Sequence, residues 1–250
     1  ESIVRNVNRK ARNLRFFEVG NVYHFDEERY TTESPIKAYQ QRYHLALWVT
    51  GHRVEGNWAH PDEESSFFEL KAHVENVLRR VGLQAGQVVT EASDNNIFDK
   101  GLRMKTRGGK VLVDMGIVNH HVLRRFDIEQ PVYYAEIDWT ELMKATRKNC
   151  LLFQELSKYP AVSRDLALLV DANVEFAQIE QIARQTEKKL LKQVVLFDVY
   201  QGKNLPEGKK SYAVNFILQD ESRTLTDKAI EAIMQKLMKN LTTKLHAELR

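Results

Sequence analysis

The sequence lacks most of the features that assign a chain to a particular chemistry or compartment. Cys150 is its single cysteine, which excludes an internal disulfide and a zinc site built on cysteines. Such sparse cysteine fits a reducing compartment, and we expect the protein in the cytoplasm. No apolar run approaches the roughly 20 residues that span a membrane, and no signal peptide opens the chain. We therefore expect no membrane partner.

Catalytic motifs are also missing. No glycine-rich phosphate loop of either common spacing occurs, and no nucleophile-elbow pattern is present. The eight histidines lack the spacing of metal ligands, and His120-His121 is interpreted as structural because neighbouring side chains on one element diverge. A Ser-His-Asp arrangement depends on the fold and is left open. We expect no catalytic residue, no metal and no cofactor in this chain itself.

What the sequence does contain is an ordinary hydrophobic content of 43% and a small net charge of +3. This content is enough for a core. The excess positive charge lies in residues 156–250, which hold 15 basic and 12 acidic residues, whereas residues 1–155 hold 22 of each. It is a mild indication of a polyanionic partner. The chain begins with Glu1 inside an expected helix, and we interpret it as a piece of a longer protein.

Residues 1–150 predict a first domain of the α+β class, in which hairpin-paired strands are combined with helices. Gly20 is expected to mark a bulge or a close approach in the first strand. Residues 107–110, Arg-Gly-Gly-Lys, predict a tight hairpin, and Ser65 or Ser66 can cap the clearest helix. Strands are expected at 16–25, 43–50, 102–106, 110–118 and 132–137, the first two pairing antiparallel, and helices at 1–12, 65–81, 119–126 and 139–146.

Residues 157–250 predict a second domain, after a boundary near 148–157. Its expected strands are 166–170, 194–200, 212–218 and 247–249, and its expected helices are 176–190 and 228–245, the latter capped by Thr226. The resulting order is strand, helix, strand, strand, helix, strand. This βαββαβ order within roughly ninety residues is the ferredoxin-like plan.

Three short blocks in the second domain join hydrophobic elements to polar residues that packing alone does not require. They are Tyr-Pro-Ala-Val-Ser-Arg-Asp-Leu-Ala at 159–167, Leu-Phe-Asp-Val-Tyr at 196–200 and Leu-Pro-Glu-Gly-Lys-Lys-Ser at 205–211, followed by Arg-Thr-Leu-Thr-Asp at 223–227. In this order they resemble the ferredoxin-fold anticodon-binding domain of the bacterial phenylalanyl-tRNA synthetase β subunit. The first domain resembles the catalytic-like core of that subunit, through Arg-Phe-Phe-Glu-Val-Gly-Asn-Val-Tyr at 15–23, Trp58 and Phe-Phe-Glu-Leu-Lys at 67–71.

This resemblance covers nearly the whole chain and implies a role inside a larger enzyme. Enzymes of the family join phenylalanine to its tRNA with ATP and Mg²⁺, and the α subunit of an α2β2 heterotetramer carries the catalysis. The first domain is then a class II synthetase core without catalysis that serves in subunit assembly. A class II site needs an arginine on its central strand pair to hold the ATP α-phosphate, and the equivalent strand here has Glu18 after Phe17. The family's editing module is expected upstream.

The resemblance also implies how the second domain recognises RNA. Alternation along the strand at 194–200 places Asp198 and Tyr200 on the face of Leu196. A carboxylate there can accept hydrogen bonds from N1–H and N2–H of guanine, the first anticodon base of phenylalanine tRNA, and a tyrosine can stack on a base. By resemblance, Ala167 is the small residue against which this base packs, and Ser211 lies nearby.

Other interpretations of these residues stay open. Asp198 can instead form an ion pair with Arg164 or Lys210, and Arg164 can pair with Asp165 rather than contact phosphate. Lys210 is expected in a turn, where lysines are usually solvated, and Arg223 can reach the RNA backbone. The candidate tRNA-binding residues are Asp198, Tyr200, Ala167, Ser211, Arg164, Arg223 and Lys210. The competing function is a scaffold that only assembles subunits and has negligible affinity for RNA.

Overall fold

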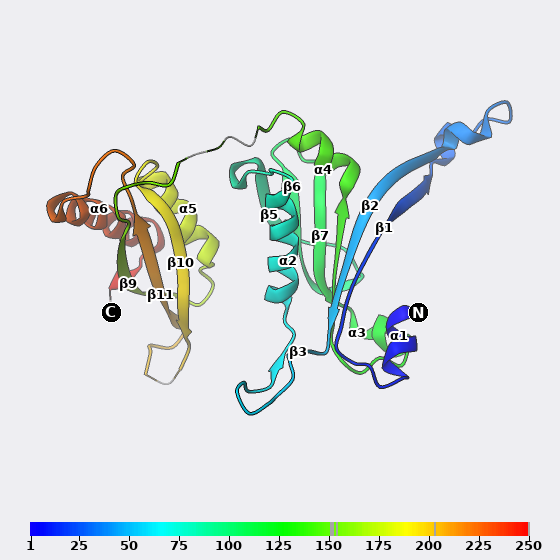
Figure 1. Cartoon of the computed structure of the whole chain (residues 1–250), viewed down its shortest axis with the longest axis horizontal. Helices are drawn as coiled ribbons and strands as arrows, with labels where there is room; N and C mark the ends of the chain where they lie inside the picture. The colour runs from blue at the N-terminus through cyan, green and yellow to red at the C-terminus, as the bar shows by residue number, and fades with distance from the viewer. Residues whose placement is uncertain (151–152, 154, 203, 250) are drawn as a thin grey trace. The chain divides into compact units, whose positions relative to one another are not determined.

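The computed structural model describes residues 1–150, 153, 155–202 and 204–249. The chain divides into two compact units, Glu1–Leu152 and Phe153–Arg250, and each unit has its own sheet (Figure 1). Each unit also has its own hydrophobic core. The two are therefore described one after the other.

The first unit is built on a six-stranded antiparallel sheet of order β1-β2-β8-β7-β6-β5. All predicted strands of this unit are present, and the antiparallel pairing of the first two is confirmed. A small hairpin, β3 with β4, follows β2. The strands are β1 (Leu14–Phe25), β2 (Tyr39–Thr50), β3 (His52–Val54), β4 (Glu63–Glu64), β5 (Val88–Ala92), β6 (Phe98–Thr106), β7 (Val111–Val118) and β8 (Val132–Asp138).

Helices cover part of each face of this sheet. They are α1 (Ser2–Val7), α2 (Phe67–Arg80), α3 (His120–Arg125) and α4 (Trp139–Thr146), with 3-10 turns η1 (Glu27–Arg29), η2 (Pro35–Ala38) and η3 (Ala85–Gln87). The main core lies under α2 and α4, where Leu70 and Leu142 pack with Ile137 of β8. A smaller cluster under α1 and α3 includes Val118 and Val132 on the other face. The helix predicted at 65–81 begins as expected, because the Ser66 hydroxyl accepts a hydrogen bond from the third residue that follows it.

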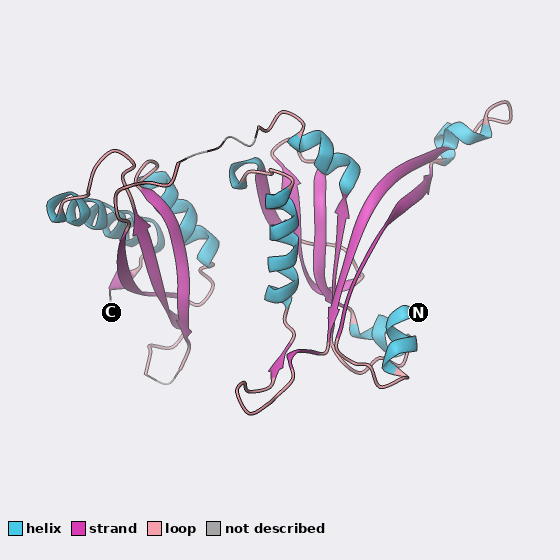
Figure 2. Cartoon of the chain, in the orientation of Figure 1, coloured by secondary structure: helices cyan, strands magenta, loops and turns pink. Residues whose placement is uncertain are grey.

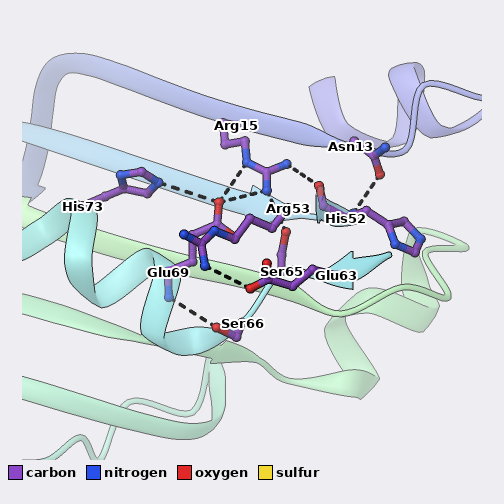
Figure 3. A network of polar contacts seen from close by, with 9 residues as sticks. All are labelled: Asn13, Arg15, His52, Arg53, Glu63, Ser65, Ser66, Glu69 and His73. Carbon is purple, nitrogen blue, oxygen red and sulfur yellow. Dashed lines mark hydrogen bonds and ion pairs between the residues drawn. The ribbon is translucent and has the colours of Figure 1, made fainter. Parts of the chain in front are cut away.

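A polar network ties β1 to the start of α2 and to the small hairpin (Figure 3). Arg15 donates to Glu69 Oε1 from Nε at 3.0 Å and from Nη2 at 2.8 Å. The same guanidinium reaches the His52 carbonyl at 2.8 Å and Ser65 Oγ at 2.9 Å. The Glu69 side chain is only 10% exposed, so the arginine offsets the cost of burying its charge. This arginine, which opens the block at 15–23, therefore holds three elements together.

The far halves of β1 and β2 extend beyond the rest of the first unit as a two-stranded arm (Figure 1). Residues that pair across the arm share a face, and that face is rich in aromatic side chains. Its exposed apolar members, each at least 42% exposed, are Phe17, Val19, Tyr23, Phe25, Tyr39 and Tyr43. A contiguous apolar stripe of this kind is typical of a surface that another protein covers.

The second unit is a four-stranded antiparallel sheet of order β10-β11-β9-β12 with two helices packed on one face (Figure 2). Its elements are β9 (Val162–Asp171), α5 (Phe176–Thr186), β10 (Leu191–Tyr200), β11 (Lys209–Leu218), α6 (Asp227–Leu245) and β12 (Glu248–Leu249). The predicted βαββαβ order is confirmed. Thr226 caps α6 as predicted, because its side chain accepts a hydrogen bond from the backbone N–H of Ala229.

Alternate residues of the central strand β11 point to opposite faces of this sheet. Val214, Phe216 and Leu218 point toward the helices and are fully buried in the core. The residues that alternate with them, such as Ala213 and Asn215, lie on the opposite face and are partly exposed. Alternation along one central strand therefore gives the second unit a covered face and an open face.

Two expectations about the first unit are wrong. Gly20 pairs with His44 in unbroken register, and a Cβ placed on it would meet no atom within 4 Å. It therefore marks neither a bulge nor a close approach. The first helix ends at Val7 rather than at residue 12, and Lys10 beyond it adopts a left-handed φ of 65° that no helix can continue through.

Two further expectations fail for local reasons. The side chains of His120 and His121 were expected to point apart, but their ring centroids lie only 3.9 Å from each other at the start of α3. Helix α5 ends at Thr186 rather than at residue 190. The chain leaves the helix there because Leu191 is already part of β10, where it is buried in the core.

Candidate nucleic-acid interface

A bulge in β10 decides which way Asp198 points. Leu196 pairs with Val214, whereas Asp198 pairs with Ala213, so that Phe197 is an extra residue between them. Directly paired residues lie on the same face, and Val214 faces the helices while Ala213 lies on the open face. The prediction that Asp198 shares the face of Leu196 is therefore wrong. The bulge shifts the alternation by one residue and turns the carboxylate to the open face.

A pocket of about 510 Å³ lies on this open face. Small side chains from the two central strands, Ala167, Ala213 and Ser211, line it, and the first two are directly paired. Asp198 and Tyr200 line it from the edge strand β10, where they pair with Ala213 and Ser211. The structure thus brings together four of the predicted residues, and the small ones leave room for a flat ligand beside the carboxylate.

The Asp198 carboxylate is available to a ligand. It is exposed, and within the described part of the chain it makes no ion pair. The alternative bridges to Arg164 and Lys210 do not form, because these residues pair with Phe216 and Val170, which are both buried on the covered face. An ionised carboxylate offers only acceptors, so this pocket favours a ligand with neighbouring N–H donors.

Close contact with Gly202 fixes the position of Tyr200. A Cβ placed on Gly202 would lie 2.6 Å from Oη of Tyr200, which is closer than two such atoms can pack. The tyrosine is 37% exposed, so the residue is partly covered. Glycine is therefore required at this position for the ring to stay beside the pocket.

Comparison with known families gives this geometry a context. Residues 157–250 match the ferredoxin-fold anticodon binding domain, and residues 1–139 match the phenylalanyl tRNA synthetase beta chain CLM domain. The second match alone covers more than half of the chain. The chain belongs to the phenylalanyl-tRNA synthetase beta chain family. The resemblance found in the sequence is confirmed, as is the ferredoxin fold of the second unit.

Curated members of this family align along the full chain. The sequence is 55% identical to the phenylalanine–tRNA ligase beta subunit of Bacteroides thetaiotaomicron, 54% to that of Bacteroides fragilis and 48% to that of Porphyromonas gingivalis. Each alignment covers 100% of this chain and 30% of the relative, so the chain spans about 30% of their length. The pyrrolysyl-tRNA synthetase structure from Desulfitobacterium hafniense, with 12% identity over 59% of this chain and 48% of its own and a TM-score of 0.41, is too distant to support an argument.

Arg164 does not line the pocket, although the sequence predicts it to contact tRNA. It pairs with a residue of the covered face, and its Nη1 donates to the neighbouring Ser163 carbonyl at 2.9 Å. The alternative ion pair between Arg164 and Asp165 does not form either. Asp165 lies on the open face, where it accepts a hydrogen bond from Asn215.

The other two predicted cations also lie away from the pocket. Lys210 belongs to β11 rather than to a solvated turn, and it is only 8% exposed. Its Nζ lies 4.8 Å from the centroid of the Tyr212 ring, so a cation–π contact replaces the expected solvation. Arg223 is exposed and forms an ion pair with Asp220, with 3.2 Å between Nε and Oδ2.

Sequence reasoning missed residues that complete the pocket. Ala213 follows Ser211 by two positions on a strand, so simple alternation could have placed it on the same face. Asn204 lines the pocket from the loop between β10 and β11, and no periodic pattern marks a loop residue. Gly202 is a common loop residue whose contact with the tyrosine ring becomes visible only in three dimensions.

The described residues show neither a metal-ligand cluster nor a membrane-spanning helix. Among them, no group of three or more histidine, cysteine, aspartate or glutamate side chains is arranged to hold a metal ion. None of the described helices is long and apolar enough to cross a membrane.

Gly202→Ala is expected to weaken ligand binding while leaving the fold intact. The added methyl group displaces the flexible end of the Tyr200 side chain rather than any backbone atom. Unfolding free energy should therefore change by less than about 0.5 kcal/mol, as for other surface substitutions. Binding of an anticodon stem–loop, measured by NMR titration, should weaken, and Gln201→Ala, at the exposed neighbouring position, serves as the control. Unchanged affinity would show that the tyrosine ring does not contribute.

Proposed function

We propose that this chain is the part of a phenylalanine–tRNA ligase β subunit that supplies anticodon recognition and subunit assembly. The observation that supports it best is the pocket in the second unit, where Asp198, Tyr200, Ala167 and Ser211 lie together. Relatives that align along the whole of this chain carry the name phenylalanine–tRNA ligase beta subunit, and the second unit matches an anticodon binding domain. Charging of tRNA would place the protein in the cytoplasm.

The pocket has the chemistry of a guanine reader. Guanine presents N1–H and N2–H side by side, and a carboxylate accepts both at once. Ala167 and Ala213 leave a flat space for the base, and Tyr200 offers part of its ring for stacking. Such stacking and edge contacts are how proteins read unpaired bases in RNA loops. The first anticodon base of phenylalanine tRNA is guanine, which fits this pocket.

The first unit would take the part of a class II synthetase core without catalysis. Its antiparallel sheet fits that architecture, and by the family resemblance the strand that would carry an ATP-binding arginine has Glu18 after Phe17 instead. The aromatic stripe on the β1–β2 arm supports contact with an α subunit, in an α2β2 heterotetramer. ATP and Mg²⁺ would then act in the α subunit, and this chain would bind neither.

Binding of an anticodon stem–loop RNA to the full chain tests the proposal. NMR titration at low salt detects even millimolar binding, so weak affinity does not hide the result. We expect salt-dependent binding that weakens when the first anticodon guanine is replaced by inosine, which lacks only the N2 amino group. Binding without any preference between guanine and inosine would contradict guanine recognition. No binding would favour the competing function, an assembly scaffold.

A further inference from the structure

The small hairpin of the first unit presents a fully exposed tryptophan. Trp58 is 99% exposed and lies in the loop between β3 and β4, directly before the start of α2 (Figure 1). The Asn57 side-chain oxygen accepts hydrogen bonds from the backbone N–H groups of Ala59 at 2.9 Å and His60 at 3.2 Å, which gives this loop a defined shape. A large apolar side chain held in water by a structured loop is typical of an anchor for another protein. We call residues 52–64 the finger.

A pocket of about 800 Å³ lies at the opposite end of α2. Four apolar side chains, from β2, the end of α2 and the start of α4, line it together with one amide and two guanidinium groups. These residues are Leu45, Val77, Val81, Trp139, Asn76, Arg79 and Arg80. The volume is in the range of pockets that enclose small organic molecules, so it has room for an indole ring. We call this pocket the socket, and it includes none of the residues of the aromatic stripe on the arm.

The finger and the socket are complementary in charge and in chemistry. The finger holds four acidic residues and one basic residue, whereas the charged residues of the socket are Arg79 and Arg80, both exposed. An arginine guanidinium packs well on the face of a tryptophan ring, and Trp139 offers an aromatic partner inside the socket. A tryptophan flanked by carboxylates, as in the finger, is therefore a ligand that suits this socket.

The finger of a chain does not reach the socket of the same chain. The 14 residues of α2 separate them, and a helix of this length spans about 21 Å. A two-fold axis perpendicular to α2 would place two such helices antiparallel, with the start of each beside the end of the other. Each finger would then lie at the socket of the other copy, which is the reciprocal contact that a closed dimer requires.

The outer face of α2 suits such an antiparallel arrangement. Phe68, Ala72 and Asn76 follow one another at intervals of four residues, so they share a face, and all three are exposed. The alanine in the middle lets two helices approach closely, and the 76% exposed Phe68 would be covered. Two buried tryptophans would contribute about 300–500 Å², which is roughly a quarter of a standard protein–protein interface of about 1,600 Å².

We propose that two copies of this chain form a two-fold dimer in which Trp58 of each copy enters the socket of the other. Arg79 and Arg80 hold the indole ring and pair with the acidic residues of the finger. The dimer uses surfaces of the first unit alone and does not depend on the function proposed above.

Sedimentation equilibrium of the full chain over a range of concentrations tests this dimer. We expect a reversible equilibrium between monomer and a species of twice its mass. In Trp58→Ala the dissociation constant of the dimer should rise at least about 100-fold, because each dimer loses two anchor side chains. The exposed indole adds little to the fold, so circular dichroism should be unchanged. Ile36→Ala removes another exposed apolar side chain, 82% exposed at the end of the arm, and should leave the equilibrium as it is.

A mixing experiment tests the reciprocal arrangement. The double variant Arg79→Glu, Arg80→Glu places negative charge in the socket, where it repels the acidic finger. Neither this variant nor Trp58→Ala should dimerise well alone. An equimolar mixture should form mixed dimers, because the intact finger of the double variant can enter the intact socket of Trp58→Ala. Their dissociation constant should lie at least about tenfold below that of either variant alone and at least about tenfold above that of the unaltered chain.

Three other results would overturn the proposal. A chain that stays monomeric at its highest soluble concentration has no such interface, and its socket is left for a different partner. A dimer that survives in Trp58→Ala, or variants that fail to associate when mixed, would show that the finger does not enter the socket. Assemblies that grow beyond two copies would contradict the two-fold arrangement, because head-to-tail insertion does not close at a dimer.

Discussion

Asp198→Asn is expected to weaken binding of the native anticodon stem–loop by about 10- to 100-fold, the range for hydrogen bonds to a charged group. An asparagine has a single acceptor oxygen, so it cannot receive N1–H and N2–H together. The substitution also removes a negative charge from an RNA-binding surface, which by itself strengthens attraction to phosphates. Loss of the charge should therefore raise RNA affinity. A measured fall in affinity would indicate that the specific contact with the base has been lost.

Two controls make this result specific to the base. Glu180→Gln removes the same charge from α5, on the helix side of the sheet, and should leave RNA affinity within about twofold. In a double-substitution cycle, the penalty for replacing guanine by inosine should shrink in Asp198→Asn, because one of the two hydrogen bonds is then already lost. Equal inosine penalties in both proteins would show that Asp198 does not contact the base.

The fold was predictable from sequence wherever one face of an element is buried. The helix at 67–80 and the strands of the second unit carry apolar residues at regular intervals. The order of the elements in the second unit was therefore predicted correctly. Strand β5 was missed because it is an edge strand whose residues are all partly or fully exposed, so it shows no hydrophobic pattern. The outer halves of β1 and β2 are likewise exposed. The second strand was therefore predicted to begin at residue 43, whereas β2 begins at Tyr39.

The candidate site was predictable in composition but not in geometry. Family motifs identified Asp198 and Ala167, yet strict alternation put the carboxylate on the face of Leu196, which in the structure is the covered face. The bulge at Phe197 reverses that outcome, and a single inserted residue leaves no periodic signal in the sequence. Lys210 was misplaced for a related reason. The sequence after Gly208 looks like a loop, whereas pairing with β9 extends the strand to Lys209 and buries the lysine.

Phe216→Ala is expected to destabilise the second unit by about 3–5 kcal/mol, the cost of a large cavity in a core. Phe216 is fully buried on the central strand β11, where the cavity cannot collapse without moving both helices. The first unit should keep its stability, because the clusters around Phe216 and around Ile137 share no residue. The expected result is therefore two separate unfolding transitions.

The distribution of tryptophans allows the two transitions to be observed separately. Trp48, Trp58 and Trp139 are the three tryptophans of the chain, and all lie in the first unit. In urea unfolding of Phe216→Ala, far-UV circular dichroism should report an early loss of structure while tryptophan fluorescence remains unchanged. The matched variant Ile137→Ala, with its cavity in the first core, should instead move the fluorescence transition. If Phe216→Ala shifts the fluorescence midpoint as far as the circular dichroism midpoint, the units unfold as one cooperative body.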